Sequence, residues 1–249
     1  MDSLSACDTS PMVTFQNVSK SYVKGKKAVD GLTLDVPDGA IYGFLGPNGA
    51  GKSTTIKMMA SLLLPDAGKL TIGGHEAGGD ALPIKAMVGY VPDEPLFYDK
   101  MTGRQHLAFI CDVYRVEERE KRIGELCALL DFHALDDEIA SYSHGMKQKL
   151  SVISALVHQP KLLILDEPMV GLDPKSAYAL KTMMRRYAQE GNTVFFSTHV
   201  LEVAQEVCTL VGIIDHGKLL YSGTFQDLQK GSDRTLEELF LSLTERQNA

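Results

Sequence analysis

Long hydrophobic runs are absent from this chain of 249 residues. No stretch reaches the roughly 18 consecutive apolar residues that a membrane-spanning helix needs, so we expect no segment to cross a membrane by itself. The first residues also lack the basic and apolar regions of a secretory signal. We therefore predict a short disordered tail over residues 1–11.

The chain has few cysteines and fewer basic than acidic residues. The four cysteines are far apart and form no C-x-x-C pair, and with seven scattered histidines they make a structural metal site unexpected. Thiols without a disulfide framework are typical of a reducing cytoplasm. The net charge is −7, with 25 Lys and Arg against 32 Asp and Glu, so we predict no nucleic-acid partner.

What is present is the composition of an ordinary globular protein, with 44% hydrophobic and 23% charged residues. The length allows one large or two small domains with ample core. Short apolar runs predict strands at residues 13–15, 32–36, 40–45, 69–72, 87–91, 161–165, 193–196 and 210–214. Between about residues 96 and 158 the strand signal nearly vanishes, and helices are predicted over 102–114, 117–130 and 143–158. The chain is therefore expected to be an α/β protein with a helical insertion.

One glycine-rich segment follows a predicted strand directly: Gly46-Pro47-Asn48-Gly49-Ala50-Gly51-Lys52-Ser53. It matches the phosphate-binding pattern G-x-x-x-x-G-K-[ST], and residues 54–64 behind it have helical periodicity. Glycines let backbone N–H groups converge on phosphate oxygens, and a helix N-terminus adds positive potential. Lys52 can reach the β- and γ-phosphates, and the Ser53 hydroxyl can ligate Mg²⁺. We predict a nucleoside triphosphate site made by these residues and the adjacent Thr54.

An acidic pair, Asp166-Glu167, ends another apolar strand. A carboxylate there can hold Mg²⁺ through its water shell, so Asp166 is the candidate. Glu167 would then face the γ-phosphate and polarise an attacking water, and Glu167→Gln should trap bound ATP. Such a pair is also a common turn signal. The phosphate loop upstream favours the catalytic interpretation.

About twenty residues earlier stands the segment Ser143-His144-Gly145-Met146-Lys147-Gln148, with Ser143 as a plausible helix N-cap. From about residue 12 to residue 243 the chain resembles the nucleotide-binding subunit of an ATP-binding cassette (ABC) transporter. In that family this signature segment opens a helix whose N-terminus binds the γ-phosphate held by a second copy, so two subunits enclose two ATP molecules. The resemblance implies a P-loop ABC-ATPase fold over residues 12–249, with an N-terminal antiparallel β subdomain and a helical subdomain at approximately 96–158.

The resemblance implies roles for three further residues. Tyr22 resembles the aromatic that stacks on adenine, Asp173 the aspartate of a loop that communicates across the dimer, and His199 the switch histidine that bonds the γ-phosphate. By themselves these residues have ordinary alternatives. An aromatic in a strand usually belongs to the core, and a single histidine after a strand is weak evidence of function.

Two residues depart from the family pattern. Asp93 stands where the family usually has a glutamine that touches Mg²⁺ and the attacking water, on a loop that senses the membrane subunit. Aspartate is shorter and cannot donate when ionised, but we expect it to accept from a metal-bound water. His144 stands where the signature segment normally has glycine, and the sequence leaves open whether its imidazole touches ATP.

The expected function is an ATPase that binds ATP and Mg²⁺ and powers transport by separate transmembrane permease subunits at the cytoplasmic face of the cell membrane. A second ATPase subunit is required and is expected to be an identical copy. The resemblance is closer to bacterial exporters than to importers, and the cargo is left open. Two alternatives remain: a soluble ABC ATPase that remodels a cytosolic complex, and a nucleotide-gated regulator. A helix near residues 236–243 is expected either to pack on its own domain or to dock a partner.

Overall fold

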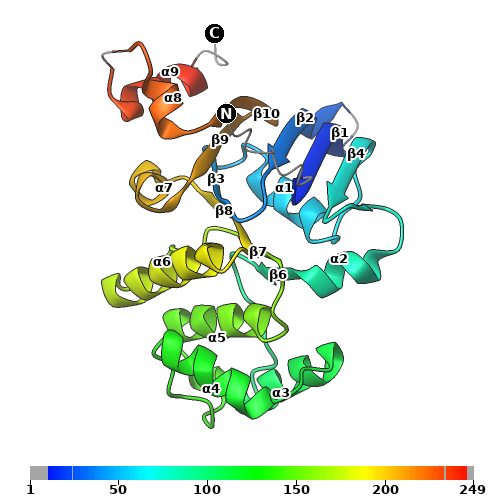
Figure 1. Cartoon of the computed structure of the whole chain (residues 1–249), viewed down its shortest axis with the longest axis vertical. Helices are drawn as coiled ribbons and strands as arrows, with labels where there is room; N and C mark the ends of the chain where they lie inside the picture. Colours follow the sequence, from blue (N-terminus) through cyan, green and yellow to red (C-terminus); the bar gives the residue numbers. More distant parts are fainter. Residues whose placement is uncertain (1–10, 24, 233, 246–249) are drawn as a thin grey trace, which may run out of the picture.

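The computed structural model describes residues 11–23, 25–232 and 234–245 (Figure 1). Of the tail predicted over residues 1–11, only the last residue lies within this range. Two sheets and a set of surrounding helices make up the described chain, so the predicted α/β class is confirmed.

The larger sheet carries the candidate site at one edge. It has six strands in the order β10-β9-β3-β8-β7-β6, of which β9 to β6 run parallel and β10 is antiparallel. Its strands are β3 (Ile41–Leu45), β6 (Val88–Val91), β7 (Leu162–Leu165), β8 (Thr193–Thr198), β9 (Leu210–Asp215) and β10 (Lys218–Gly223). Every residue of β3, β7 and β8 is buried, as expected for central parallel strands covered on both faces. The carboxyl ends of β3, β8, β7 and β6 therefore meet at one edge.

The smaller sheet is antiparallel and has the order β2-β1-β4-β5. It consists of β1 (Val13–Val23), β2 (Lys26–Val36), β4 (Ala67–Ile72) and β5 (His75–Glu76). Its inward side chains, such as Phe15 and Leu70, share one buried cluster with Ile56 of helix α1 (Lys52–Met59) and Phe195 of β8. This packing fixes the hairpin of β1 and β2 beside the phosphate loop.

Three helices fill the chain between β6 and β7, as predicted: α3 (Gly103–Tyr114), α4 (Arg119–Leu129) and α5 (His144–Leu156). A short 3-10 turn, η1 (Ile139–Ser141), precedes α5. In Figure 1 they form the green lower part of the molecule. Buried residues on α3, α4 and α5, among them Leu107, Ile123 and Leu150, pack in one cluster with β7. Whether this part is a subdomain with bounds near 96 and 158 stays a prediction.

The remaining helices cover the sheets: α1 (Lys52–Met59), α2 (Ala81–Met87), α6 (Pro174–Gln189), α7 (Leu201–Val207), α8 (Phe225–Gln229) and α9 (Leu236–Glu245). The predicted bounds of α1 were wrong at both ends. It begins at Lys52 and ends by Ala60, because Ser61 takes a left-handed conformation and the next two N–H groups bond back to Lys57. Met87 ends α2 and does not start the following strand.

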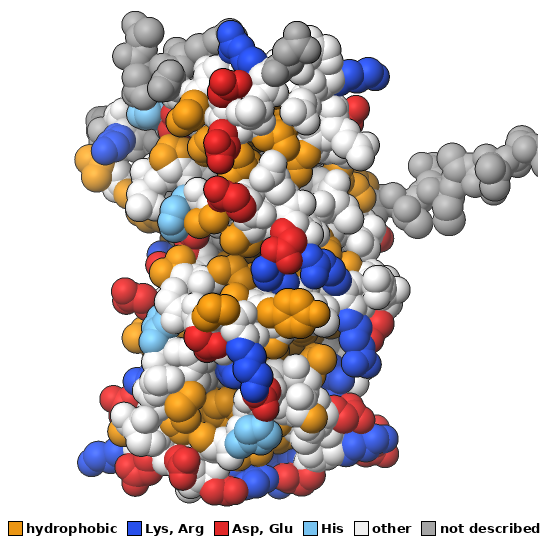
Figure 2. Space-filling view, turned by 90° about the vertical axis from the view of Figure 1, so that its left-hand side faces the viewer, with side chains coloured by type: hydrophobic (Ala, Val, Ile, Leu, Met, Phe, Trp, Pro, Cys, Tyr) orange, Lys and Arg blue, Asp and Glu red, His pale blue; other side chains and the backbone are white. Residues whose placement is uncertain are grey.

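Helix α9 packs on its own chain. Leu236, Phe240 and Leu243 lie against the buried cluster that includes Leu45 and Leu201. The contacts support the first of the two interpretations of this helix. On the face shown in Figure 2, basic side chains are interspersed with acidic ones and with hydrophobic patches. Across residues 11–23, 25–232 and 234–245, no helix combines the length and hydrophobicity needed to span a bilayer.

Candidate functional site

The phosphate loop, residues 46–53, joins β3 to α1 and lies close to neighbouring backbone. A Cβ atom on Gly46 would lie 2.2 Å from the Ile214 carbonyl oxygen, and one on Gly51 would lie 2.4 Å from that of Ala28. Gly51 also has φ 110° at the N-cap of α1, so glycine is required there on both grounds. It provides no side-chain cap for the first turn of α1. Uncapped N–H groups at a helix N-terminus are suited to bind phosphate.

Lys52 is held inside this loop. Its side chain is only 6% exposed, and its Nζ donates to the carbonyl oxygens of Gly46 at 2.7 Å and Pro47 at 3.2 Å. The same Nζ lies 3.2 Å from Glu167 Oε1, an ion-pair contact without hydrogen-bond geometry. Among the described residues, this buried carboxylate oxygen has no hydrogen-bond partner. The lysine of the loop and the acidic pair after β7 therefore lie together, as the sequence predicts.

The acidic pair is held by Ser197, near the end of β8, and by His199, which follows this strand. Glu167 has a left-handed backbone, with φ 46°, and its N–H donates to Ser197 Oγ at 2.8 Å. The Ser197 hydroxyl in turn donates to Asp166 Oδ1 at 2.6 Å. On the other side, His199 Nδ1 lies 3.0 Å from Glu167 Oε2. The sequence pattern gave no role to Ser197, and only its place before Thr198 and His199 could have drawn attention to it.

Asp93 follows β6, the neighbour of β7, and faces the same carboxylates. Burial raises the pKa of the Asp93 carboxyl, and the charges of Asp166 and Glu167 raise it further. Such a group of like charges is suited to a cation. Within the part of the chain that the structure describes, no three acidic, histidine or cysteine side chains form a metal cage on their own. Mg²⁺ usually takes one or two carboxylates and completes its shell with waters and substrate phosphates.

Tyr22 lies beside the phosphate loop and contacts Thr54. The Tyr22 hydroxyl lies 3.3 Å from Thr54 Oγ1, and the tyrosine ring is 60% exposed at the end of β1. Ser53 is exposed in the first turn of α1, whereas Thr54 is buried. Tyr22 is thus an exposed aromatic beside the phosphate loop and does not belong to the core.

The signature segment, residues 143–148, forms the tip of α5. Ser143 is the N-cap, and its Oγ accepts from the Met146 N–H at 3.3 Å. Gln148 is buried, at 3% exposure, while Gly145, Met146 and Lys147 are partly exposed. Among the described residues, no hydrogen bond joins this segment to the phosphate loop. Within the described part of one chain, the two predicted parts of the ATP site are therefore not joined by a hydrogen bond.

His144 and Asp173 contact the loop that leads from the acidic pair to α6. His144 Nε2 lies 3.2 Å from the Val170 carbonyl oxygen. Asp173 is the N-cap of α6 and accepts from the Lys175 and Ser176 N–H groups and the Ser176 hydroxyl. The hydrogen bond from the Ser176 hydroxyl holds the pKa of Asp173 below its usual value. Both side chains are exposed at the surface of the single chain.

Known proteins share this arrangement of sequence and fold. A family model described as ABC transporter matches residues 29–170. The chain belongs to the ABC transporter family. This ABC protein is an ATPase, and its fold is the P-loop ABC-ATPase fold that the sequence predicts.

Two relatives and one solved structure illustrate the likeness. This ABC ATPase is 36% identical over 220 residues to the linearmycin resistance ATP-binding protein LnrL of Bacillus subtilis, covering 87% of this chain and 70% of LnrL. It is 36% identical over 230 residues to the bacitracin transport ATP-binding protein BcrA of Bacillus licheniformis, covering 92% and 74%. A solved ATP-binding subunit of an ABC transporter superposes with a TM-score of 0.87 at 30% identity, over 93% of this chain and 99% of the other.

Proposed function

We propose that this ABC ATPase drives transport through separate membrane subunits, and that two copies enclose two Mg²⁺-bound ATP molecules. The observation that carries the proposal is the division of the site. Lys52, Asp166 and Glu167 converge in one chain, whereas the tip of α5 with Ser143 lies elsewhere on it. A second copy supplies the missing part.

The proposal gives a role to each residue of the phosphate and metal site and to Tyr22 beside it. Backbone N–H groups of the phosphate loop and of the first turn of α1 bind the phosphates together with the Lys52 ammonium, and the exposed Tyr22 ring stacks on adenine. The Ser53 hydroxyl, Asp166 and Asp93 hold Mg²⁺. Bound there, Mg²⁺ neutralises charge that develops on the phosphate oxygens.

Glu167 is the proposed general base. Its Oε1 faces Lys52 and its Oε2 faces His199, so the carboxylate is held at two points beside the phosphate loop. When Lys52 turns to the phosphates, Oε1 is free to accept a proton from the attacking water. His199 keeps the carboxylate in position and bonds the γ-phosphate through its other ring nitrogen.

The tip of α5 completes the neighbouring site. Ser143 caps this helix tip, and the residues that follow in the first turn include no acidic side chain. A positive helix end of this kind suits the γ-phosphate bound by a second copy. Asp173 lies on the surface loop that would face that copy.

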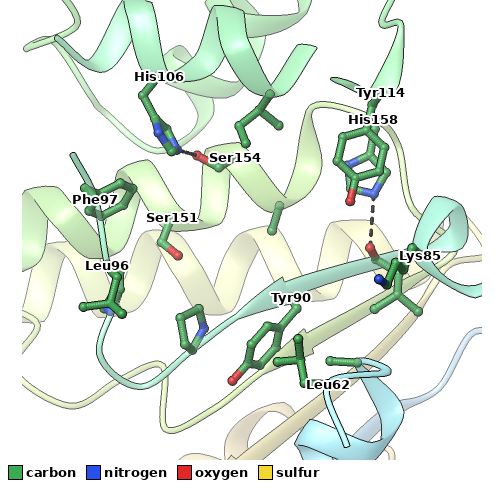
Figure 3. A pocket seen from close by; sticks show the side chains of 16 residues that line it. Leu62, Lys85, Tyr90, Leu96, Phe97, His106, Tyr114, Ser151, Ser154 and His158 are labelled. Atoms are coloured by element: carbon green, nitrogen blue, oxygen red, sulfur yellow. Dashed lines mark hydrogen bonds between the residues drawn. The ribbon is translucent and has the colours of Figure 1, made fainter. Parts of the chain in front are cut away.

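A groove offers a docking place for the membrane subunit. It has a volume of about 330 Å³ and lies where the loop after β6 meets α3 and α5 (Figure 3). Leu96 lines it and is 92% exposed, only three residues after Asp93. A permease segment in this groove would contact the loop that carries Asp93. We therefore place the chain at the cytoplasmic face of the membrane, held there by the permease. The roles of LnrL in linearmycin resistance and of BcrA in bacitracin transport favour export of an antibiotic-like compound.

Purification with the membrane subunit tests this function. Glu167→Gln should lower ATP turnover by at least about 100-fold, because a positioned base contributes 10²–10⁴ in rate. It should also retain two ATP per two chains in a complex that elutes as a dimer of the ATPase. Glu237→Gln, on the exposed face of α9, is the matched control and should behave as the parent.

The same purification separates the alternatives. A nucleotide-loaded Glu167→Gln chain that stays monomeric beside its membrane partner would contradict the proposal. Recovery of active ATPase with a cytosolic complex, and with no multi-span protein, would instead favour a soluble remodelling ATPase.

A further inference from the structure

His144 stands at the first position of α5, where the family resemblance leads us to expect glycine. We propose that His144 is a positioning residue that fastens the tip of α5 to the 167–173 loop and thereby couples the two ATP sites of the dimer. The inference rests on the proposed function. The 167–173 loop starts at the proposed base, Glu167, and ends at the N-cap of α6, Asp173.

The first contact is a hydrogen bond with a defined direction. His144 Nε2 lies 3.2 Å from the Val170 carbonyl oxygen. A carbonyl oxygen can only accept, so the proton must be on Nε2. Within the described residues, His144 is the hydrogen-bond partner of the Val170 carbonyl oxygen. Loss of the imidazole would leave the carbonyl to water.

The second contact is steric. A Cβ atom on Gly171 would lie 2.8 Å from His144 Cδ2 and 3.0 Å from its Nε2, so the imidazole ring packs directly on the Gly171 backbone. Gly171 has φ +72°, a conformation that glycine adopts without strain. One residue further along each segment, Leu172 approaches Gly145, where an added Cβ would lie 3.8 Å from Leu172 Cδ2. The loop is therefore seated against the tip of α5 at two successive residues.

The coupling follows because the tip of α5 and the 167–173 loop serve different ATP sites. In the proposed dimer, the tip of α5 binds the γ-phosphate of the partner copy, while Glu167 acts on the ATP of its own chain. Val170 lies three residues from Glu167, and its N–H bonds back to the Glu167 carbonyl at 3.2 Å. A shift of the α5 tip on binding the partner's ATP is thus passed through His144 to the loop that starts at Glu167. This is how one site would sense the other.

Steady-state ATP hydrolysis by the complete transporter tests the coupling. His144→Phe keeps a planar ring but loses the N–H donor, and His144→Gln places an amide donor near the position of Nε2. We expect His144→Phe to lower kcat by about 2- to 10-fold, the range that one net hydrogen bond supplies. Its Hill coefficient for ATP should fall from near 2 toward 1, with KM changed less than about twofold. His144→Gln should restore both, and His75→Gln, an exposed histidine on β5, is the matched control.

Each other outcome has a distinct meaning. A raised KM with an unchanged Hill coefficient in His144→Phe would show that the imidazole contacts nucleotide directly, and would overturn the positioning role. A parent Hill coefficient of 1, or a His144→Phe variant identical to the parent, would overturn the coupling. Dimer formation by Glu167→Gln is measured separately. If that dimer forms while His144→Phe has no effect, the proposed function stands and this inference alone fails.

Amide hydrogen exchange provides a readout at the contact itself. In the nucleotide-bound complex, His144→Phe should speed exchange in the peptide that covers residues 168–173, and His144→Gln should not. Exchange that is the same in both variants and the parent would mean that the bond to Val170 does not hold this loop.

Discussion

Ser197 bonds to two residues of the candidate site at once. Its hydroxyl accepts from the Glu167 N–H and donates to Asp166 Oδ1, at 2.8 and 2.6 Å. Glu167 is also one of eight non-glycine residues with a positive φ among those described, a conformation that costs about 1 kcal/mol or more unless its surroundings hold it. Ser197 is therefore the residue that keeps the proposed base in its unusual backbone conformation.

Ser197→Ala should accordingly damage both stability and turnover. The change leaves a backbone donor and a buried carboxylate oxygen without their partner, at a cost of about 1–3 kcal/mol in the free energy of unfolding. Urea unfolding measures this loss, and we expect kcat to fall by at least about 10-fold as Glu167 loses its position. Ser242→Ala, on α9, is the control for loss of a serine hydroxyl. A Ser197→Ala variant with parental kcat would contradict the positioning of Glu167 by Ser197.

At the scale of the element, two helices begin with comparable caps but in different surroundings. Asp173 caps α6, and Thr102 caps α3 through a reciprocal capping box with Gln105. Thr102 pairs with Glu138 inside the helical part, whereas Asp173 ends the 167–173 loop. The two caps should therefore affect stability alike and activity differently.

Replacement of each cap by alanine checks this. Asp173→Ala and Thr102→Ala should each lower the free energy of unfolding by about 1 kcal/mol, the usual cost of a lost N-cap. For a chain of this size such a loss shifts the thermal midpoint by about 2–4 °C. In the complete transporter, Thr102→Ala should keep the parental ATPase rate and Asp173→Ala should lose most of it. Equal rates in the two variants would place the Asp173 loop outside the dimer contact.

On the scale of the whole molecule, the groove of Figure 3 lies between the helical part and the large sheet and is lined by residues of both. Tyr114 of α3 stacks on His158 with ring centroids 3.9 Å apart, and His158 Nε2 donates to the Val88 carbonyl of β6 at 3.2 Å. The other ring nitrogen of His158 is buried and has no hydrogen-bond partner within the part of the chain that the structure describes. The neutral imidazole of His158 therefore fits this site. A second proton, on Nδ1, would find no acceptor among the described residues.

This environment predicts a pH dependence of stability. Burial lowers the pKa of His158, and burial likewise lowers the pKa of His106, which lines the same groove. In the unfolded chain both titrate near their ordinary pKa of about 6.5. Above that pH both states are neutral and the full stability is present. As pH falls below it, the unfolded chain binds protons first, so stability is lost progressively as pH falls toward the folded pKa values.

Urea unfolding at pH 7.5 and pH 5 measures the effect. The parent should be less stable at pH 5, and the variant with both His158→Phe and His106→Phe should lose less stability over this interval. His75→Gln, exposed on β5, should follow the parent. If the double variant and the parent lose equal stability, other groups are responsible for the acid sensitivity.

The rim of the groove predicts a second effect at this scale. Leu96 is almost fully exposed and belongs to none of the buried clusters of the described residues, so Leu96→Glu should leave the free energy of unfolding within about 0.5 kcal/mol of the parent. If a permease segment binds in the groove, the charge should abolish co-purification with the membrane subunit, because it buries an unpaired carboxylate. Leu241→Glu, exposed on α9 at the opposite end in Figure 1, should have no such effect. Unimpaired co-purification of Leu96→Glu would place the permease elsewhere.

The sequence by itself determined those features that depend on neighbours in the chain. The strand, glycine loop and helix around Lys52, the acidic pair that ends β7 and the Ser143 cap of α5 are local patterns of hydrophobic period, turn chemistry and helix capping. The family resemblance rests on the same segments. The left-handed turn at Ser61, which shortens α1, was missed because its signal lies in the backbone and not in a residue type.

Only the tertiary structure decided the contacts between segments far apart in the chain. β3 lies between β9 and β8, so the loop after β3 meets Glu167 and His199 at one sheet edge. The bonds of Ser197 to Asp166 and of His144 to Val170 cross 31 and 26 positions of sequence. Local propensity cannot specify such pairs, because strand order and helix packing, which are properties of the whole buried core, determine which distant side chains come within reach.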